Sequence, residues 1–133
     1  MYTHSINQRT MNEKAFKTLI DYLERTPSIQ KPIAFGDDDG LWWVKFSIDI
    51  DNKLAWNVIQ ELGHVINYIS IDERLPTIFY PVSPPPYMNG GPFDFLSWII
   101  ESHDKEFKPG TLMKWLEGRL PNPVDDIEQW NIE

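Results

Sequence analysis

The histidines and the carboxylates near them are the residues of this sequence best able to do chemistry. His4, His64 and His103 form neither HxxxH nor HExxH, the spacings that place two zinc ligands on one helix face. Glu61 precedes His64 by three residues, so on a helix the two side chains would be neighbours. A carboxylate that orients an imidazole is half of a hydrolytic site. Because no nucleophile motif such as GxSxG accompanies it, we interpret the pair as structural and keep a small hydrolase as the least favoured hypothesis.

Two short motifs resemble ion-binding loops without having their spacing. The contiguous carboxylates of Asp37, Asp38 and Asp39 lack the alternating ligands of an EF-hand loop, and its twelfth position, which should be glutamate, is Ile48. Gly90-Gly91-Pro92 could open a helix toward an anion but lacks the GxGxxG and GxxxxGK[ST] spacings. The sequence therefore predicts no metal site, no cofactor and no catalytic residues, and the aspartates are interpreted as a solvated turn or a partner contact.

Charge is the first property that bears on partners. Twenty acidic and twelve basic residues give a net charge of −8, and their distribution is uneven. Residues 1–31 hold five basic and three acidic residues, or +2, whereas residues 32–133 hold seven basic and seventeen acidic, or −10. Such a body repels phosphate backbones, so we expect no nucleic-acid partner. It would attract a basic protein, although an acidic surface can also serve solubility alone.

The length of 133 residues predicts one domain, 1–133, with a hydrophobic core large enough to be stable without disulfides or a structural metal. The absence of cysteine excludes disulfides and a thiol nucleophile. The first ten residues contain no apolar signal region, and no apolar run approaches the 18 residues that indicate a membrane span. We therefore expect no membrane association and a cytoplasmic location.

The clearest elements lie in the first half of the chain. A capping box at 10–13 precedes a helical apolar stripe, which predicts a helix over 11–25. Strict alternation of apolar residues over 42–50 predicts a strand, paired with 31–35 through a loop of about five residues, 36–40.

From Asn52 the apolar period changes to that of a helix, which we expect to begin at Asp51 or Asn52 and to reach Tyr68. Gly63 and the β-branched residues after it leave open whether 64–71 is helix or strand. The remaining chain predicts an edge-like strand over 76–82, an irregular loop over 83–92, a helix from Pro92 to His103, a short helix over 111–117 and an acidic tail over about 120–133. The fold class is α+β, with a small antiparallel or mixed sheet and three to four flanking helices.

Aromatic residues beside carboxylates mark the surface most suited to a protein partner. Most of the six tryptophans are expected in the core, but Trp43 shares its strand face with polar residues and Trp130 lies in the acidic tail. These two are the candidates for exposure, and the alternative is that each lies under a neighbouring element. Exposed aromatic residues dominate the binding energy of interfaces. The predicted partner-binding residues are Asp37, Asp38, Asp39, Trp43, Asp125, Asp126, Glu128 and Trp130.

Several motifs in the last 60% of the chain carry a resemblance to a known family: Ala55-Trp56, the stretch Gln60–Gly63, the proline-rich Pro81–Pro92, Phe95–Ile99 and Trp115–Pro121. In these motifs the chain resembles the immunity proteins of bacterial contact-dependent growth inhibition. The resemblance implies a cytoplasmic, non-enzymatic inhibitor that covers the active site of a cognate toxin domain, commonly a basic nuclease. It carries over no catalytic motif and no fixed interface residues. A non-toxin adaptor module that uses the proline-rich loop is the alternative.

Overall fold

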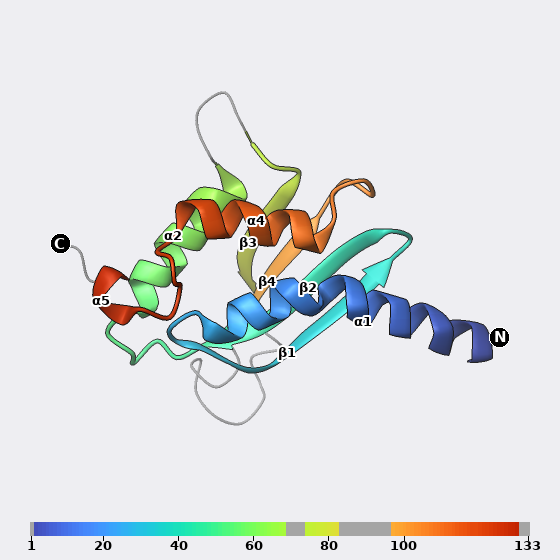
Figure 1. Ribbon diagram of the computed structural model, residues 1–133, viewed down its shortest axis with the longest axis horizontal. Helices are drawn as coiled ribbons and strands as arrows, with labels where there is room; N and C mark the ends of the chain where they lie inside the picture. The colour runs from blue at the N-terminus through green and yellow to red at the C-terminus, as the bar shows by residue number, and fades with distance from the viewer. Residues whose placement is uncertain (1, 69–73, 83–96, 131–133) are drawn as a thin grey trace.

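The structure is a computed structural model that describes residues 2–68, 74–82 and 97–130, with only the backbone described for residues 2–12. Its centre is a four-stranded sheet formed by β1 (Ile29–Asp38), β2 (Leu41–Ile48), β3 (Thr77–Val82) and β4 (Ser97–Ser102). The strand order is β1-β2-β4-β3, and every neighbouring pair is antiparallel (Figure 1). β4 is therefore central although it is the last strand in sequence, and β1 and β3 form the two edges.

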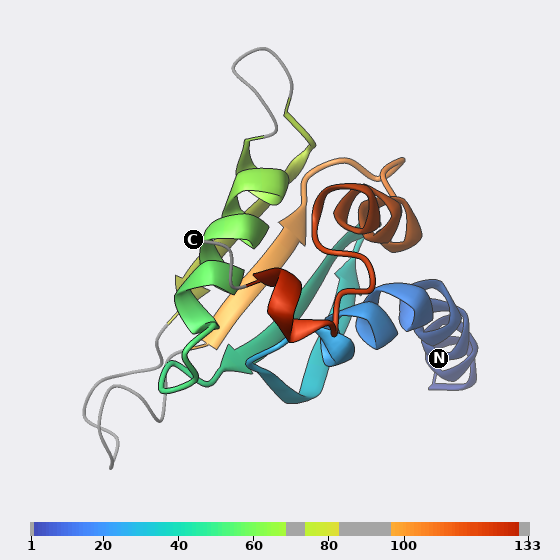
Figure 2. The ribbon, with the colours of Figure 1, turned by 60° about the vertical axis from the view of Figure 1, so that its left-hand side comes forward.

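Four helices accompany the sheet in the described residues: α1 (Tyr2–Arg25), α2 (Ala55–Asn67), α4 (Pro109–Arg119) and the single turn α5 (Ile127–Trp130). They gather on one side of the sheet, with α1 along β1 and α2 along β3 (Figure 2). The described residues thus form an α+β fold with one antiparallel sheet and four helices, as the sequence predicts. None of the described helices combines the length and the apolar character that crossing a membrane requires.

Alternation along the strands places the core between the sheet and the helices. In β2, Trp42, Val44, Phe46 and Ile48 are buried, whereas the intervening residues point to the other face. Phe16 of α1 packs against this inner face, with its ring 5.9 Å from that of Trp42 in an edge-to-face arrangement. We call the opposite side, which none of the described helices covers, the outer face.

The hairpin between β1 and β2 confirms the two predicted strands but corrects their connection. Asp38 pairs with Leu41, so only Asp39 and Gly40 form the turn, not the five residues that the sequence led us to expect. Both have positive φ, 58° and 87°, which is the type I′ geometry that an Asp-Gly pair favours because it matches the twist of the strands. The local signal was therefore present in the sequence.

The predicted helix from Pro92 to His103 is wrong where the structure describes it, because 97–102 is strand β4; residues 92–96 lie outside the described part. Trp98 and Ile100 face the core, whereas Ile99 and Glu101 face outward. The short apolar run fitted both periods, and hydrogen bonding on both sides, to β2 and β3, decides for the strand. The strand over 76–82 is confirmed as β3 and lies at an edge as expected.

The helix boundaries also differ from those predicted. α1 begins at Tyr2, so residues 10–13 lie inside it and do not form a capping box at its start. α2 runs through Gly63 to Asn67, so residues 64–67 are helical, and 69–73 lie outside the described residues, as does the loop 83–92. α2 is preceded by Leu54, whose backbone N–H donates to Asn52 Oδ1 at 2.8 Å.

Candidate functional site

The structure separates the two predicted acidic clusters. Asp37–Asp39 lie at the hairpin turn, which opens β2, whereas Asp125, Asp126 and Glu128 lie in the segment around α5. That segment contacts the first turn of α2, which follows the far end of β2, through a hydrogen bond from Asn57 Nδ2 to the Trp130 carbonyl at 3.2 Å. The hairpin turn and α5 accordingly lie at opposite ends of the molecule (Figure 1). The predicted residues form two sites at most, not one.

At the hairpin end all three aspartates are exposed. Asp37 Oδ1 accepts a hydrogen bond from the Gly40 backbone N–H at 2.9 Å, so this carboxylate also holds the turn. Trp43 is half-buried on the outer face, where its ring lies over Gly36 of the neighbouring strand. A Cβ atom on Gly36 would be only 2.6 Å from Trp43 Cε2, so this approach requires glycine. Trp43 is partly available to a partner.

In the C-terminal segment the three carboxylates have different environments. Asp126 is half-buried and caps α5: its Oδ1 accepts from the Glu128 backbone N–H at 3.3 Å and its Oδ2 from Gln129 Nε2 at 2.9 Å. Asp125 and Glu128 are exposed and have no such structural role among the described contacts. Within this cluster, Asp125 and Glu128 are therefore the carboxylates available to a partner.

Trp130 is buried, so of the two interpretations left open for it, the one that places it under a neighbouring element is correct. Only 3% of it is accessible, and its indole N–H donates to the Val124 carbonyl at 2.7 Å. Leu120 and Val124 are buried with it. The predicted acidic tail is, from 120 to 130, packed against the rest of the domain, because these three apolar side chains extend the core.

The exposed tryptophan near this segment is Trp56, which the sequence analysis did not select as a candidate partner-binding residue. It lies in the first turn of α2, and 57% of it is accessible. Ile127 of α5 is 55% accessible. The helical stripe of α2 could have revealed Trp56, because the buried residues Val58 and Leu62 and the other core positions leave 56, 60 and 64 on the solvent side. We call the following accessible or half-buried residues of α2 and of the segment around α5 the α2–α5 surface: Trp56, Asn57, Gln60, Glu61, Asp125, Ile127 and Glu128.

A groove of about 500 Å³ opens in this surface between α2, the end of α4 and α5. Its lining combines carboxamides, one carboxylate and one guanidinium with apolar atoms: Asn57, Gln60, Gln129, Glu61, Arg119, Leu120, Pro121 and Trp130. The Arg119 guanidinium also lies 5.2 Å from the centre of the Trp115 ring, a cation–π distance that restrains it. A concave, polar wall beside two exposed apolar side chains is suited to receive a protruding side chain of a partner.

The predicted neighbours Glu61 and His64 both lie on the exposed side of α2. Glu61 lines the groove, whereas His64 does not. Among the described residues no hydrogen bond or ion pair joins them, and no group of three or more histidine or acidic side chains is arranged to hold a metal ion. The pair thus lacks the mutual contact that an acid–base couple requires.

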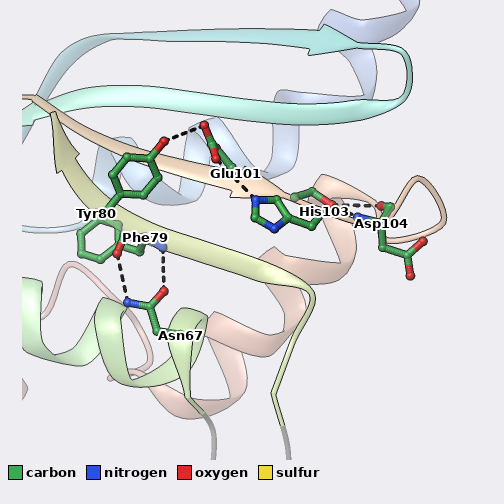
Figure 3. A network of polar contacts seen from close by, with 7 residues as sticks. Asn67, Phe79, Tyr80, Glu101, His103 and Asp104 are labelled. Atoms are coloured by element: carbon green, nitrogen blue, oxygen red, sulfur yellow. Dashed lines mark hydrogen bonds and ion pairs between the residues drawn. The ribbon is translucent and has the colours of Figure 1, made fainter.

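A polar network on the outer face was not foreseen from the sequence (Figure 3). The Tyr80 hydroxyl of β3 donates to Glu101 Oε2 of β4 at 2.7 Å, and His103 Nε2 lies 3.5 Å from Glu101 Oε1. The hydrogen bond to the carboxylate raises the pKa of Tyr80, because ionising the phenol would remove the bond and bring two negative charges together. The network joins β3 to β4, and we assign it to the support of the sheet.

Comparison of the chain with protein-family models, curated proteins and solved structures gives no match. The resemblance to immunity proteins therefore remains a prediction.

Proposed function

We propose that this protein binds a basic protein partner through the α2–α5 surface, and that it acts in the cytoplasm as the immunity protein of a toxin domain whose active site it covers. The observation that carries the proposal is the exposed Trp56 on the helix that contacts the acidic α5 segment. Tryptophan is among the residues most enriched at the centre of interfaces, and here it lies near the exposed Ile127 and the acidic side chains of the α5 segment.

The negative charges of the surface support a positively charged partner. Asp125 and Glu128 are exposed, and the chain as a whole carries −8, so a basic domain would be steered toward it. A toxin that binds nucleic acid must present Lys and Arg at its active site, because these neutralise phosphates. An acidic protein with an aromatic anchor is complementary to such a cleft.

The proposal is tested with the partner captured by pull-down from the native source, or with any toxin-like domain found to be encoded next to this gene. We expect Trp56→Ala to raise the dissociation rate at least tenfold, because it removes the anchor. We expect Asp125→Asn combined with Glu128→Gln to slow association mainly, and more at low salt, since exposed charges act over about 8 Å at 0.15 M. Asp126 is left unchanged because it caps α5.

The matched control is Glu13→Gln combined with Glu106→Gln, which removes the same two charges from exposed positions outside the α2–α5 surface. If the association rate fell equally in the control, Asp125 and Glu128 would act only through the net charge of the protein and not as part of the interface. If Trp56→Ala bound as tightly as the wild type, the α2–α5 surface would not be the interface. If the bound partner kept its activity, the immunity role would be excluded in favour of an adaptor.

A further inference from the structure

The two edges of the sheet differ in whether another strand can join them. The His103 N–H donates to the Pro76 carbonyl, so along β3 the backbone N–H and carbonyl groups of even-numbered residues point toward β4. The backbone groups of odd-numbered residues therefore point away from the sheet. At Phe79 the outward groups are already used: its N–H donates to Asn67 Oδ1 at 2.7 Å and its carbonyl accepts from Asn67 Nδ2 at 3.0 Å (Figure 3). The next outward residue, Pro81, has no N–H. The β3 edge is therefore blocked at Phe79 and Pro81.

The same alternation carried across the sheet shows that the edge of β1 is open. The backbone groups of even-numbered residues of β4 point toward β2, so the backbones of Val44 and Phe46 bond to β4. The backbones of Trp43 and Lys45 therefore bond to β1. The backbone N–H and carbonyl groups of their partners Gly36 and Ala34 therefore point toward β2. The N–H and carbonyl groups of Phe35 and Asp37 point outward, and no hydrogen bond joins them to another described residue.

We propose that the edge of β1 over residues 34–38 accepts an extended, basic segment of a protein partner as a fifth strand. The four free backbone groups of Phe35 and Asp37 supply the strand pairing, which is the way exposed sheet edges bind peptides. The stretch is regular, because the irregularity in the β1–β2 register lies before it, between Gln30 and Ala34.

Charge selects the occupant. Asp37, Asp38 and Asp39 are all exposed at the end of this stretch, and opposite charges across neighbouring strands are favourable whereas like charges are not. Charged residues on an edge normally deter pairing. Here they deter acidic strands and a second copy of this chain, which carries the same carboxylates and a net charge of −8. A segment with lysine or arginine at alternate positions is the one that fits.

The probe is a seven-residue peptide of alternating lysine and valine, blocked at both ends, titrated into the ¹⁵N-labelled full chain. We expect increased protection of the Phe35 and Asp37 amides from exchange. Two further peptides are N-methylated, one at its odd-numbered and one at its even-numbered residues. Only one of these two peptides should lose binding, because only one set of peptide N–H groups can face β1. The proposal would be overturned if both N-methylated peptides bound equally well, or if the protection from exchange were centred on β3 or α2.

Asp37→Pro and Asp37→Ala form the matched pair of variants. Both lose the carboxylate and its bond to Gly40, but only proline removes the outward N–H, and an edge strand tolerates proline at such a position. Asp37→Pro should bind the peptide at least tenfold more weakly than Asp37→Ala; equal binding would exclude pairing through this N–H. The N-methylated peptides test the same bond on the wild-type chain should the proline variant fold poorly.

The strand site is independent of the α2–α5 surface. Trp56→Ala should bind the peptide like the wild type even if it no longer binds the basic partner, so the two proposals can fail separately. Sedimentation of the free chain completes the test: a dimer that Asp37→Pro dissociates would show that the occupant is a second copy, and would overturn the assignment to a basic partner.

Discussion

Trp130 should be a principal source of stability for the C-terminal segment, and Trp130→Ala should therefore lower the free energy of unfolding strongly. The side chain is 3% accessible and contributes to the core beside Leu120 and Val124. Truncation of a buried aromatic side chain costs roughly 3–5 kcal/mol. A domain of this size is stable by about 5–15 kcal/mol, so the loss is large enough to populate a partly unfolded state.

Trp130→Phe separates packing from hydrogen bonding. Phenylalanine keeps most of the ring but leaves the Val124 carbonyl without the indole donor at 2.7 Å. An unpaired buried acceptor costs roughly 1–3 kcal/mol, so we expect this variant to lie between the wild type and Trp130→Ala.

The assay is urea unfolding followed by circular dichroism, with hydrogen exchange to locate the change. The matched control is Trp56→Ala, the same substitution at a position 57% exposed, which should change stability by no more than about 0.5 kcal/mol. If Trp130→Ala undocks only the segment, faster exchange will be confined to residues 120–130 and to α2. A loss below about 1 kcal/mol in Trp130→Ala, or one equal to that of Trp56→Ala, would refute the burial argument.

Three further perturbations test other parts of the fold. Gly36→Ala should cost roughly 1–3 kcal/mol in urea unfolding and change the tryptophan fluorescence, because the new methyl group displaces the Trp43 ring; an unchanged spectrum would contradict that packing. Asn67→Ala should lose about 1–2 kcal/mol with its two bonds to Phe79 and increase aggregation through the opened edge, while Asn67→Asp should be no better, because a carboxylate oxygen would then face the Phe79 carbonyl; light scattering measures this. Burial raises the pKa of Tyr22 to about 12, so the fold favours the neutral phenol and stability should fall as pH rises from about 10 to 12; Tyr22→Phe should flatten this decline in a pH series of unfolding curves.

The sequence was sufficient where one local period dominates. Alternation over β2 predicted both the strand and the face that it buries, and the four-residue steps of α2 predicted the helix. It was insufficient for β4, where Trp98, Ile99 and Ile100 fit a helical face and a strand equally, and where pairing with two neighbours decides.

The candidate site shows the same division. Trp56 could have been placed in solvent from the helical stripe alone, whereas the burial of Trp130 depends on docking against α2, a contact across 73 residues that no local pattern encodes. The Tyr80–Glu101 bond likewise requires the register between β3 and β4. Local spacing thus predicts which side chains an element presents, but not which elements meet.

The central place of β4 has a consequence for the order in which the chain can fold. During synthesis β2 is complete at Ile48, but its second neighbour begins only at Ser97, 49 residues later. At about 5–20 residues per second, β2 therefore lacks that partner for roughly 2 to 10 seconds after it is made. The β1–β2 hairpin can form at once through its tight turn, whereas β3 has no strand to pair with until β4 arrives. Closing such distant contacts is slow, so the rate-limiting step of folding should be the insertion of β4 between β2 and β3.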